Sequence, residues 1–252
     1  MVRGVAIRFY DPSTQRRPVA YPVFFTIGTT GRRNSGNLTE LAMKLIFVGD
    51  PMCSWCYGFH KEMTTLVEAM PDLEVQVVLG GLAAGSTQLL DDAGKQFRLT
   101  HWARVEQLSG AQFNREALLA RTNFVYDTEP VCRAVATARL IKPAANLLTV
   151  FGAFQRAFYV DGLDTTDGEV LAGIGASALK AQGFDVDAEA FLAVWSSDEA
   201  IKAARADFAL TRRLGVSGFP SLFVEQNGKI GQLSSGYATA ASVQQTLMRL
   251  AA

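Results

Sequence analysis

The sequence Cys53-Ser54-Trp55-Cys56 follows directly on the apolar run Met43-Lys44-Leu45-Ile46-Phe47-Val48-Gly49, and this junction decides the fold. The run predicts a buried strand at 44–48, and the cysteines fall where that strand gives way to a helix. Two intervening residues in the first turn of a helix bring two sulfurs close enough to bond without moving the backbone. The stretch therefore predicts a redox-active pair of thiols.

The two cysteines of this pair are expected to have different roles. Cys53 opens the predicted helix, where unpaired backbone N–H groups and the positive end of the helix dipole favour a thiolate over a thiol. Cys53 is thus the expected nucleophile, and Cys56 the expected resolving thiol.

Two other interpretations of the pair are a structural disulfide and half of a zinc site. Zinc needs further ligands at comparable spacing, and the rest of the chain offers only Cys132, His60 and His101. A disulfide that closes so short a loop removes little entropy from the unfolded chain. Both interpretations are therefore weaker than redox chemistry, and we expect no metal.

Composition limits the class of protein. The chain has 252 residues, of which 49% are hydrophobic, and its formal net charge is zero. Residues 1–42 carry six arginines against Asp11 and Glu40, so a basic leader precedes an acidic body. The body has no basic stripe for nucleic acid, and no apolar run approaches the about 20 residues that span a membrane. We expect neither kind of partner.

The leader, residues 1–42, shows no sustained periodicity and is expected to be poorly ordered. Arg16-Arg17 before the apolar stretch 18–28 is similar to a twin-arginine export signal, but that stretch contains two prolines and no small-residue cleavage site follows it. A further interpretation is that synthesis starts at Met43, so that 1–42 is an upstream extension. We expect a cytoplasmic protein.

The elements around the pair predict a thioredoxin fold. A strand at 44–48, a helix at 53–70 and a strand at 73–79 make a βαβ unit. Near the other end, strands at 221–225 and 230–233 flank an Asn-Gly hairpin turn, and a helix at 239–250 follows. This order is typical of an α/β protein with one mixed sheet and helices on its faces.

The intervening residues predict a large all-helical insertion. Their pattern is helical nearly throughout, which is more than a connection needs. The expected helices are 88–108, 114–121, 129–141, 145–159, 168–182, 187–195 and 197–213. The expected domains are a thioredoxin-like domain of 43–87 and 214–252, and an insertion domain of 88–213.

A second motif, Gly215-Val216-Ser217-Gly218-Phe219-Pro220-Ser221, ends the insertion just before the hairpin. In a thioredoxin-type sheet this position faces the redox pair, so we expect a cis peptide bond before Pro220. A cis bond is a minority state for proline, and the expectation depends on the pairing of the two motifs. The alternative is a trans proline that starts an edge strand.

With both motifs in view, residues 43–252 resemble the DsbA family of thiol-disulfide oxidoreductases, in particular its FrnE-like and protein-disulfide isomerase branches. The stretches that carry the resemblance are 49–59, Asp127-Thr128-Glu129-Pro130-Val131-Cys132-Arg133-Ala134 and 215–220. The resemblance implies that Cys53 forms a mixed disulfide, that Cys56 resolves it, and that Phe219 and Pro220 order the substrate backbone. It also implies that the insertion caps the site.

The dipeptide between the thiols departs from familiar members of the family. Ser54-Trp55 is neither the Pro-His of strong oxidants nor the Gly-Pro of thioredoxin, and Trp55 stabilises a thiolate less than histidine would. We therefore expect a reductase or isomerase rather than a strong oxidant. His60, one turn after the pair, is a candidate for tuning the thiolate, although its place on the helix favours a solvated surface histidine.

Three further sites have plainer interpretations. Cys132 lies on an apolar helical face, which favours a buried and inert cysteine over a redox sensor. His101 and Trp102 fit a helix-packing surface better than a ligand site. Asp50 is expected to form a turn rather than act on the thiols.

These observations predict a thiol-disulfide oxidoreductase that exchanges disulfides of proteins or small thiols, with glutathione or a thioredoxin system as electron partner. It would need no cofactor beyond its own redox-active disulfide. One alternative is an adaptor protein with the same fold and regulatory cysteines. Another is a glutathione-dependent isomerase or transferase, whose relatives usually have serine where this chain has Cys53.

Overall fold

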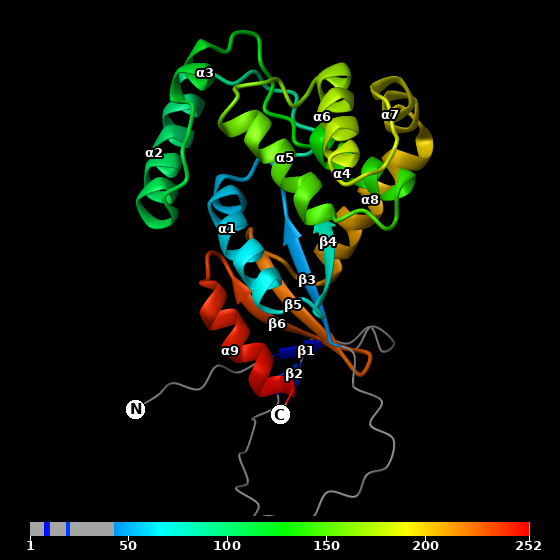
Figure 1. Cartoon of the computed structure of the whole chain (residues 1–252). Helices are drawn as coiled ribbons and strands as arrows, with labels where there is room; N and C mark the ends of the chain where they lie inside the picture. Colours follow the sequence, from blue (N-terminus) through cyan, green and yellow to red (C-terminus); the bar gives the residue numbers. More distant parts are fainter. Residues whose placement is uncertain (1–7, 11–18, 21–42, 252) are drawn as a thin grey trace, which may run out of the picture.

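The computed structural model describes residues 8–10, 19–20 and 43–251, which form a mixed sheet flanked by helices (Figure 1). The sheet order is β2-β1-β6-β5-β3-β4, in which β3 and β4 are parallel and the other neighbours antiparallel. The strands are β1 (Arg8–Tyr10), β2 (Val19–Ala20), β3 (Lys44–Gly49), β4 (Glu74–Leu79), β5 (Ser221–Gln226) and β6 (Lys229–Ser235). The predicted thioredoxin fold is confirmed.

The central strand β3 is buried on both faces of the sheet. Successive side chains of a strand point to opposite faces, so Leu45 and Phe47 join the core beneath helix α1 (Ser54–Ala69). Ile46 and Val48 instead join a smaller cluster on the other face, with Leu210 of helix α8 (Asp198–Arg213). Two covered faces explain why β3 reads as an unbroken apolar run.

The hairpin of β5 and β6 forms as its sequence predicts. Asn227 and Gly228 both have positive φ, 55° and 70°, the conformation that a tight two-residue hairpin turn requires. Helix α9 (Ala240–Ala251) then packs beside α1 on the sheet face that carries the main core.

The residues between β4 and β5 form the predicted helical insertion, which lies beyond one end of the sheet, while α8 runs alongside β4 (Figure 1). Asp91, Asn114, Asn146, Asp167, Asp187 and Ser197 each accept backbone N–H groups at a helix start. Besides α8, the helices are α2 (Asp92–Ser109), α3 (Arg115–Ala120), α4 (Glu129–Ile141), α5 (Leu147–Tyr159), α6 (Gly168–Lys180) and α7 (Ala188–Trp195).

Helix α2 shows where local pattern misplaces a boundary. The sequence predicts a helix from residue 88, but α2 begins at Asp92. Leu89 forms an isolated antiparallel bridge with Val125, and Asp91 caps the helix through its carboxylate, so the chain before Asp92 is extended. A pairing partner 36 residues away leaves no mark on local periodicity.

The leader contributes two short strands, because β1 pairs with β6 and β2 pairs with β1. The disfavoured export-signal interpretation of 16–28 and the alternative start at Met43 both stay untested, since the other residues of 1–42 lie outside the described part of the chain. Among the described residues, no helix combines the length and apolar character that a membrane crossing needs.

Candidate active site

The two cysteines of the motif occupy the first turn of α1. Cys53 is the N-cap residue, with extended backbone (φ −86°, ψ 116°), and its carbonyl accepts the N–H of Tyr57 at 3.0 Å. Cys53 is 5% exposed and Cys56 is fully buried, and both are free thiols. Because Cys53 lines a surface pocket and Cys56 does not, Cys53 is the more accessible sulfur.

The environment of Cys56 keeps it protonated. Burial raises the pKa of the Cys56 thiol well above its usual range, and a hydrogen bond and charge interaction with Cys53 raise it further. The backbone N–H of Asp50 opposes this shift. Cys56 is therefore a thiol at neutral pH, which is the form that a resolving cysteine holds until its partner has reacted.

The second motif meets the first at Cys53. The Phe219–Pro220 peptide bond is cis, as predicted. The Sγ atom of Cys53 lies 3.9 Å from the carbonyl oxygen of Phe219. The ring of Phe219 packs over Gly80, where a Cβ atom would overlap it. The need for glycine at this position is a feature that the sequence did not reveal.

Asp50 joins the redox turn to the loop that follows β4. One carboxylate oxygen accepts the N–H of Met52 at 2.8 Å, and the other accepts the N–H of Leu82 at 2.6 Å. Burial raises the pKa of the Asp50 carboxyl above its usual range, although hydrogen bonds with Thr128, Leu82 and Met52 oppose this effect. The predicted turn is present, and the carboxylate also connects two separate loops.

Cys132 is fully buried in α4, so the prediction of a buried cysteine is confirmed. Its Sγ atom lies 3.6 Å from the Asp50 carboxylate. Burial, followed by the charge of Asp50, raises the pKa of this thiol well above its usual range. Cys132 is thus a buried thiol that contacts Asp50, just before the Cys53–Cys56 motif.

His60 is not the solvated surface residue that the sequence predicted. Helix α5 covers this side of α1, and the imidazole packs on Gly152, where a Cβ atom would overlap it. Its Nδ1 atom is buried and has no hydrogen-bond partner among the residues that the structure describes. Burial lowers the pKa of His60 below its usual value. A spacing of one turn cannot reveal that another helix covers the position.

A pocket of about 410 Å³ opens beside Cys53. The Tyr126 hydroxyl donates to the carbonyl of Met52, the residue before Cys53. The Arg98 guanidinium carbon lies 3.8 Å from the centre of the Tyr126 ring. The pocket is lined by Met52, Cys53, Ser54, Trp55, Leu82, Ala83, Phe97, Arg98, His101, Trp102, Tyr126 and Phe219.

This pocket combines predicted residues with residues that the sequence analysis missed. Ser54 and Trp55 line it, and Trp102 is buried as expected for a packing residue. The His101 ring lies tilted against the Phe97 ring, at 4.5 Å between ring centres, and His101 also lines the pocket. Arg98 and Tyr126 carried no local signal, because only the folded insertion brings them to the thiols.

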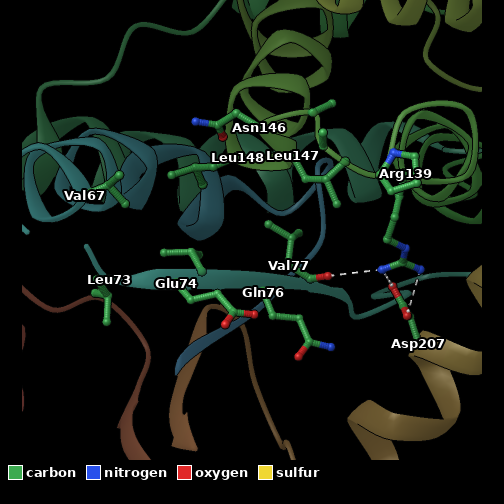
Figure 2. A pocket seen from close by; sticks show the side chains of 14 residues that line it. Val67, Leu73, Glu74, Gln76, Val77, Arg139, Asn146, Leu147, Leu148 and Asp207 are labelled. Atoms are coloured by element: carbon green, nitrogen blue, oxygen red, sulfur yellow. Dashed lines mark hydrogen bonds and ion pairs between the residues drawn. The ribbon is translucent and has the colours of Figure 1, made fainter. Parts of the chain in front are cut away.

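A larger hollow, of about 650 Å³, lies along the outer edge of β4 and away from the thiols (Figure 2). Arg139 and Asp207 form a two-bonded ion pair there, with both N–O distances at 3.1 Å. Arg139 also donates to the Val77 carbonyl at 3.3 Å, and Asp207 accepts the Leu79 N–H at 3.2 Å. The pair thus satisfies two backbone groups on the free edge of β4. No thiol is among the described residues that line this hollow.

Comparisons with known proteins agree with this geometry. Residues 44–247 match the family model of the DSBA-like thioredoxin domain. The solved structure of a candidate protein disulfide isomerase from Nitrosomonas europaea is 32% identical, with a TM-score of 0.73, and the match covers 82% of this chain and 96% of that one.

A second similar structure is the cytosolic disulfide reductase DsbM from Pseudomonas aeruginosa, which is 27% identical with a TM-score of 0.65 and coverages of 82% and 99%. The same reductase has been solved with GSH, with a TM-score of 0.66 at 27% identity and coverages of 82% and 98%. No match was found among curated proteins. The family model spans most of the chain, and the chain therefore belongs to the family of DSBA-like thioredoxin domains.

Proposed function

We propose that this protein is a thiol-disulfide oxidoreductase that works as a reductase or isomerase, with Cys53 as nucleophile and Cys56 as resolving thiol. One observation carries the proposal. Cys53 opens α1 beside a pocket and faces the Phe219 carbonyl at 3.9 Å, while Cys56 is fully buried behind it. A substrate disulfide can thus reach one sulfur first and the other only after a mixed disulfide has formed.

The proposed reaction proceeds in two exchanges. The Cys53 thiolate attacks one sulfur of a disulfide R–S–S–R′, forms Cys53–S–S–R and releases R′–S⁻, which takes a proton from water. Cys56 then gives its proton to solvent, attacks the Cys53 sulfur and releases R–S⁻, which is protonated in turn. The substrate gains two electrons and two protons, and the Cys53–Cys56 pair becomes a disulfide. Two molecules of glutathione reverse these exchanges and become glutathione disulfide.

Neighbouring residues have supporting roles in this proposal. Phe219 and Pro220 border the nucleophile and would align the substrate backbone beside it. Ser54 and Trp55, which separate the two thiols in the sequence, line the pocket and would tune the stability of the thiolate. His60 would act on α1 through the packing of its imidazole, whose buried Nδ1 atom has no hydrogen-bond partner within the described residues.

The reducing direction and a cytoplasmic location are part of the proposal. DsbM, 27% identical to this chain, is described as a cytosolic disulfide reductase. A dithiol pair in the cytosol is held reduced by glutathione, which favours reduction or isomerisation over net oxidation. Glutathione is accordingly the electron partner that we propose.

A disulfide-reduction assay tests the proposal. Wild type, Cys53→Ser and Cys132→Ser would be compared with glutathione as reductant and hydroxyethyl disulfide or insulin as substrate. We expect Cys53→Ser to fall to the uncatalysed rate. Cys132→Ser is the matched control, because the same change is made at a buried thiol outside the proposed exchange. Wild-type activity in Cys53→Ser would refute the proposal.

Reductase activity and isomerase activity can be distinguished with a substrate protein whose disulfides have been scrambled. An isomerase restores its activity without net loss of disulfides, whereas a reductase lowers the disulfide count. Cys56→Ser helps to distinguish them, since isomerisation can proceed through Cys53 alone, whereas net reduction by the pre-reduced protein without added glutathione requires the resolving thiol. If the wild-type protein neither reduces nor isomerises these disulfides, the adaptor interpretation is favoured.

A further inference from the structure

Arg98 stands out among the residues that line the pocket beside Cys53. It supplies a permanent positive charge there, and none of the described lining residues carries a carboxylate. The rest of the wall is largely apolar or aromatic, for example Leu82, Phe97 and Phe219. A volume of about 410 Å³ lies within the roughly 300–1,000 Å³ range of small-molecule sites.

The guanidinium of Arg98 is held in place by two contacts. It donates to the Gly94 carbonyl at 3.1 Å, and its central carbon lies over the Tyr126 ring, 3.8 Å from the ring centre. Tyr126 in turn donates to the carbonyl of Met52, next to Cys53. A stacked guanidinium loses little freedom when it binds a ligand, so Arg98 is ordered in advance relative to the nucleophile.

The charge of Arg98 is also uncompensated. Within residues 43–251 it forms no ion pair, and only one of its N–H groups has a recorded hydrogen bond. Four other arginines of the helical segment do have acidic partners, in the pairs Arg115–Glu106, Arg133–Glu129, Arg139–Asp207 and Arg156–Asp161. A half-buried cation beside a reactive sulfur therefore retains free donors for an anion.

We propose that Arg98 is a carboxylate-binding residue that selects disulfides with a glutathionyl group. Glutathione carries a carboxylate at each end of its backbone. Its methylene groups and planar amides can pack on the aromatic wall of the pocket. A carboxylate held by Arg98 orients the attached disulfide toward Cys53, in glutathione disulfide or in a protein mixed disulfide with glutathione. The inference rests on the proposed disulfide exchange at Cys53 and adds its substrate class.

Three small disulfides of different charge test this assignment. Pre-reduced protein would be mixed with glutathione disulfide (anionic), hydroxyethyl disulfide (neutral) or cystamine (cationic), and formation of the Cys53–Cys56 disulfide followed by rapid alkylation and mass spectrometry. The variants are Arg98→Gln and Arg98→Glu. The matched control is Arg104→Gln, which removes an exposed arginine of the same helix that does not line the pocket.

The ratio of wild-type to variant rate is compared for each disulfide separately, so that differences in leaving-group reactivity cancel. We expect Arg98→Gln to lower the second-order rate constant for glutathione disulfide about tenfold, as loss of a charge-assisted hydrogen bond predicts, and to leave hydroxyethyl disulfide nearly unchanged. Arg98→Glu should lower the rate constant for glutathione disulfide further and raise the rate constant for cystamine. Arg104→Gln should match wild type.

The neutral disulfide separates a failure of the inference from a failure of the proposed function. Suppose that hydroxyethyl disulfide reacts normally and that neither Arg98→Gln nor Arg98→Glu changes the rate constant for glutathione disulfide. The role of Arg98 is then refuted, while the exchange chemistry stands. Equal losses for all three disulfides also refute it, because they indicate a structural effect. If wild type reduces none of the three, the proposed function fails and the inference falls with it.

Discussion

The Sγ atom of Cys53 lies 3.9 Å from the carbonyl oxygen of Phe219, a residue 166 positions further along the chain. Strand pairing explains this proximity. Val48, near the end of β3, pairs with Ser221, the first residue of β5, so the loop after β3 and the loop before β5 leave the sheet side by side. The redox turn and the Phe219–Pro220 loop are thus held together by the register of two antiparallel strands.

The contact between Gly80 and Phe219 gives a prediction about activity. A Cβ atom at Gly80 would overlap the Phe219 ring, so Gly80→Ala should displace that ring from its place beside Cys53. We expect a several-fold lower kcat/KM for disulfide reduction and a stability loss of about 1–3 kcal/mol, typical of overpacking. The assay is steady-state reduction of insulin, with stability measured by urea unfolding.

A double-mutant cycle identifies the cause of this effect. In a Phe219→Ala background the added methyl has no ring to displace, so Gly80→Ala should then cost little further activity. Gly173→Ala is the control, because a Cβ there meets nothing within 4 Å, and it should keep wild-type activity. Additive losses at Gly80 and Phe219 would contradict the proposed contact.

The buried Asp50 carboxylate gives a prediction about stability. Asp50→Ala removes the carboxylate that accepts the Met52 and Leu82 N–H groups, so both donors lose their hydrogen bond. Each unsatisfied buried group costs about 1–3 kcal/mol, so the variant should lose at least about 2 kcal/mol of unfolding free energy. The control Asp72→Ala alters an exposed carboxylate and should stay within about 0.5 kcal/mol of wild type. Equal stabilities of the two variants would refute the structural role of Asp50.

His60 gives a prediction about pH. Burial lowers its pKa below the usual value of about 6.5, so the folded protein keeps His60 neutral where the unfolded chain takes up a proton. Its contribution to stability is therefore present above about pH 6.5 and is lost as the pH falls toward the lowered pKa. Unfolding free energy should drop more steeply between pH 7.5 and 5.5 in wild type than in His60→Gln.

The slope attributable to one proton cannot exceed about 1.4 kcal/mol per pH unit, which bounds the expected difference. Parallel profiles for wild type and His60→Gln would show that His60 is accessible to protons in the folded state.

Cys132 gives a prediction about thiol reactivity. It is fully buried and its pKa is raised, first by burial and then by the charge of Asp50. Thiolate is the reactive form of cysteine, so Cys132 should resist iodoacetamide in the native reduced protein while Cys53 reacts. Pulse alkylation and peptide mass spectrometry give the rate at each site. Labelling of Cys132 as fast as Cys53 would revive a redox-sensing role for the third thiol.

Most secondary structure follows from short-range sequence signals. The apolar run before Cys53, the Asn-Gly turn of the hairpin and the capping residues of the helices act between near neighbours, so pattern alone predicts them. The pair of thiols at the helix start is such a signal too. The cis bond before Pro220 follows from the presence of both motifs in one chain, not from either motif alone.

The sequence by itself determined a thioredoxin sheet with a helical insertion and two thiols at the first turn of α1, because periodicity, caps and turns depend on adjacent residues. Only the tertiary structure decided what surrounds those thiols. Arg98 and Tyr126 reach the pocket when the insertion packs onto the sheet, and Asp50 meets Leu82 across two loops. The same packing half-buries His60 against Gly152 of α5. These contacts join segments far apart in the chain, and no local pattern encodes which segments will meet.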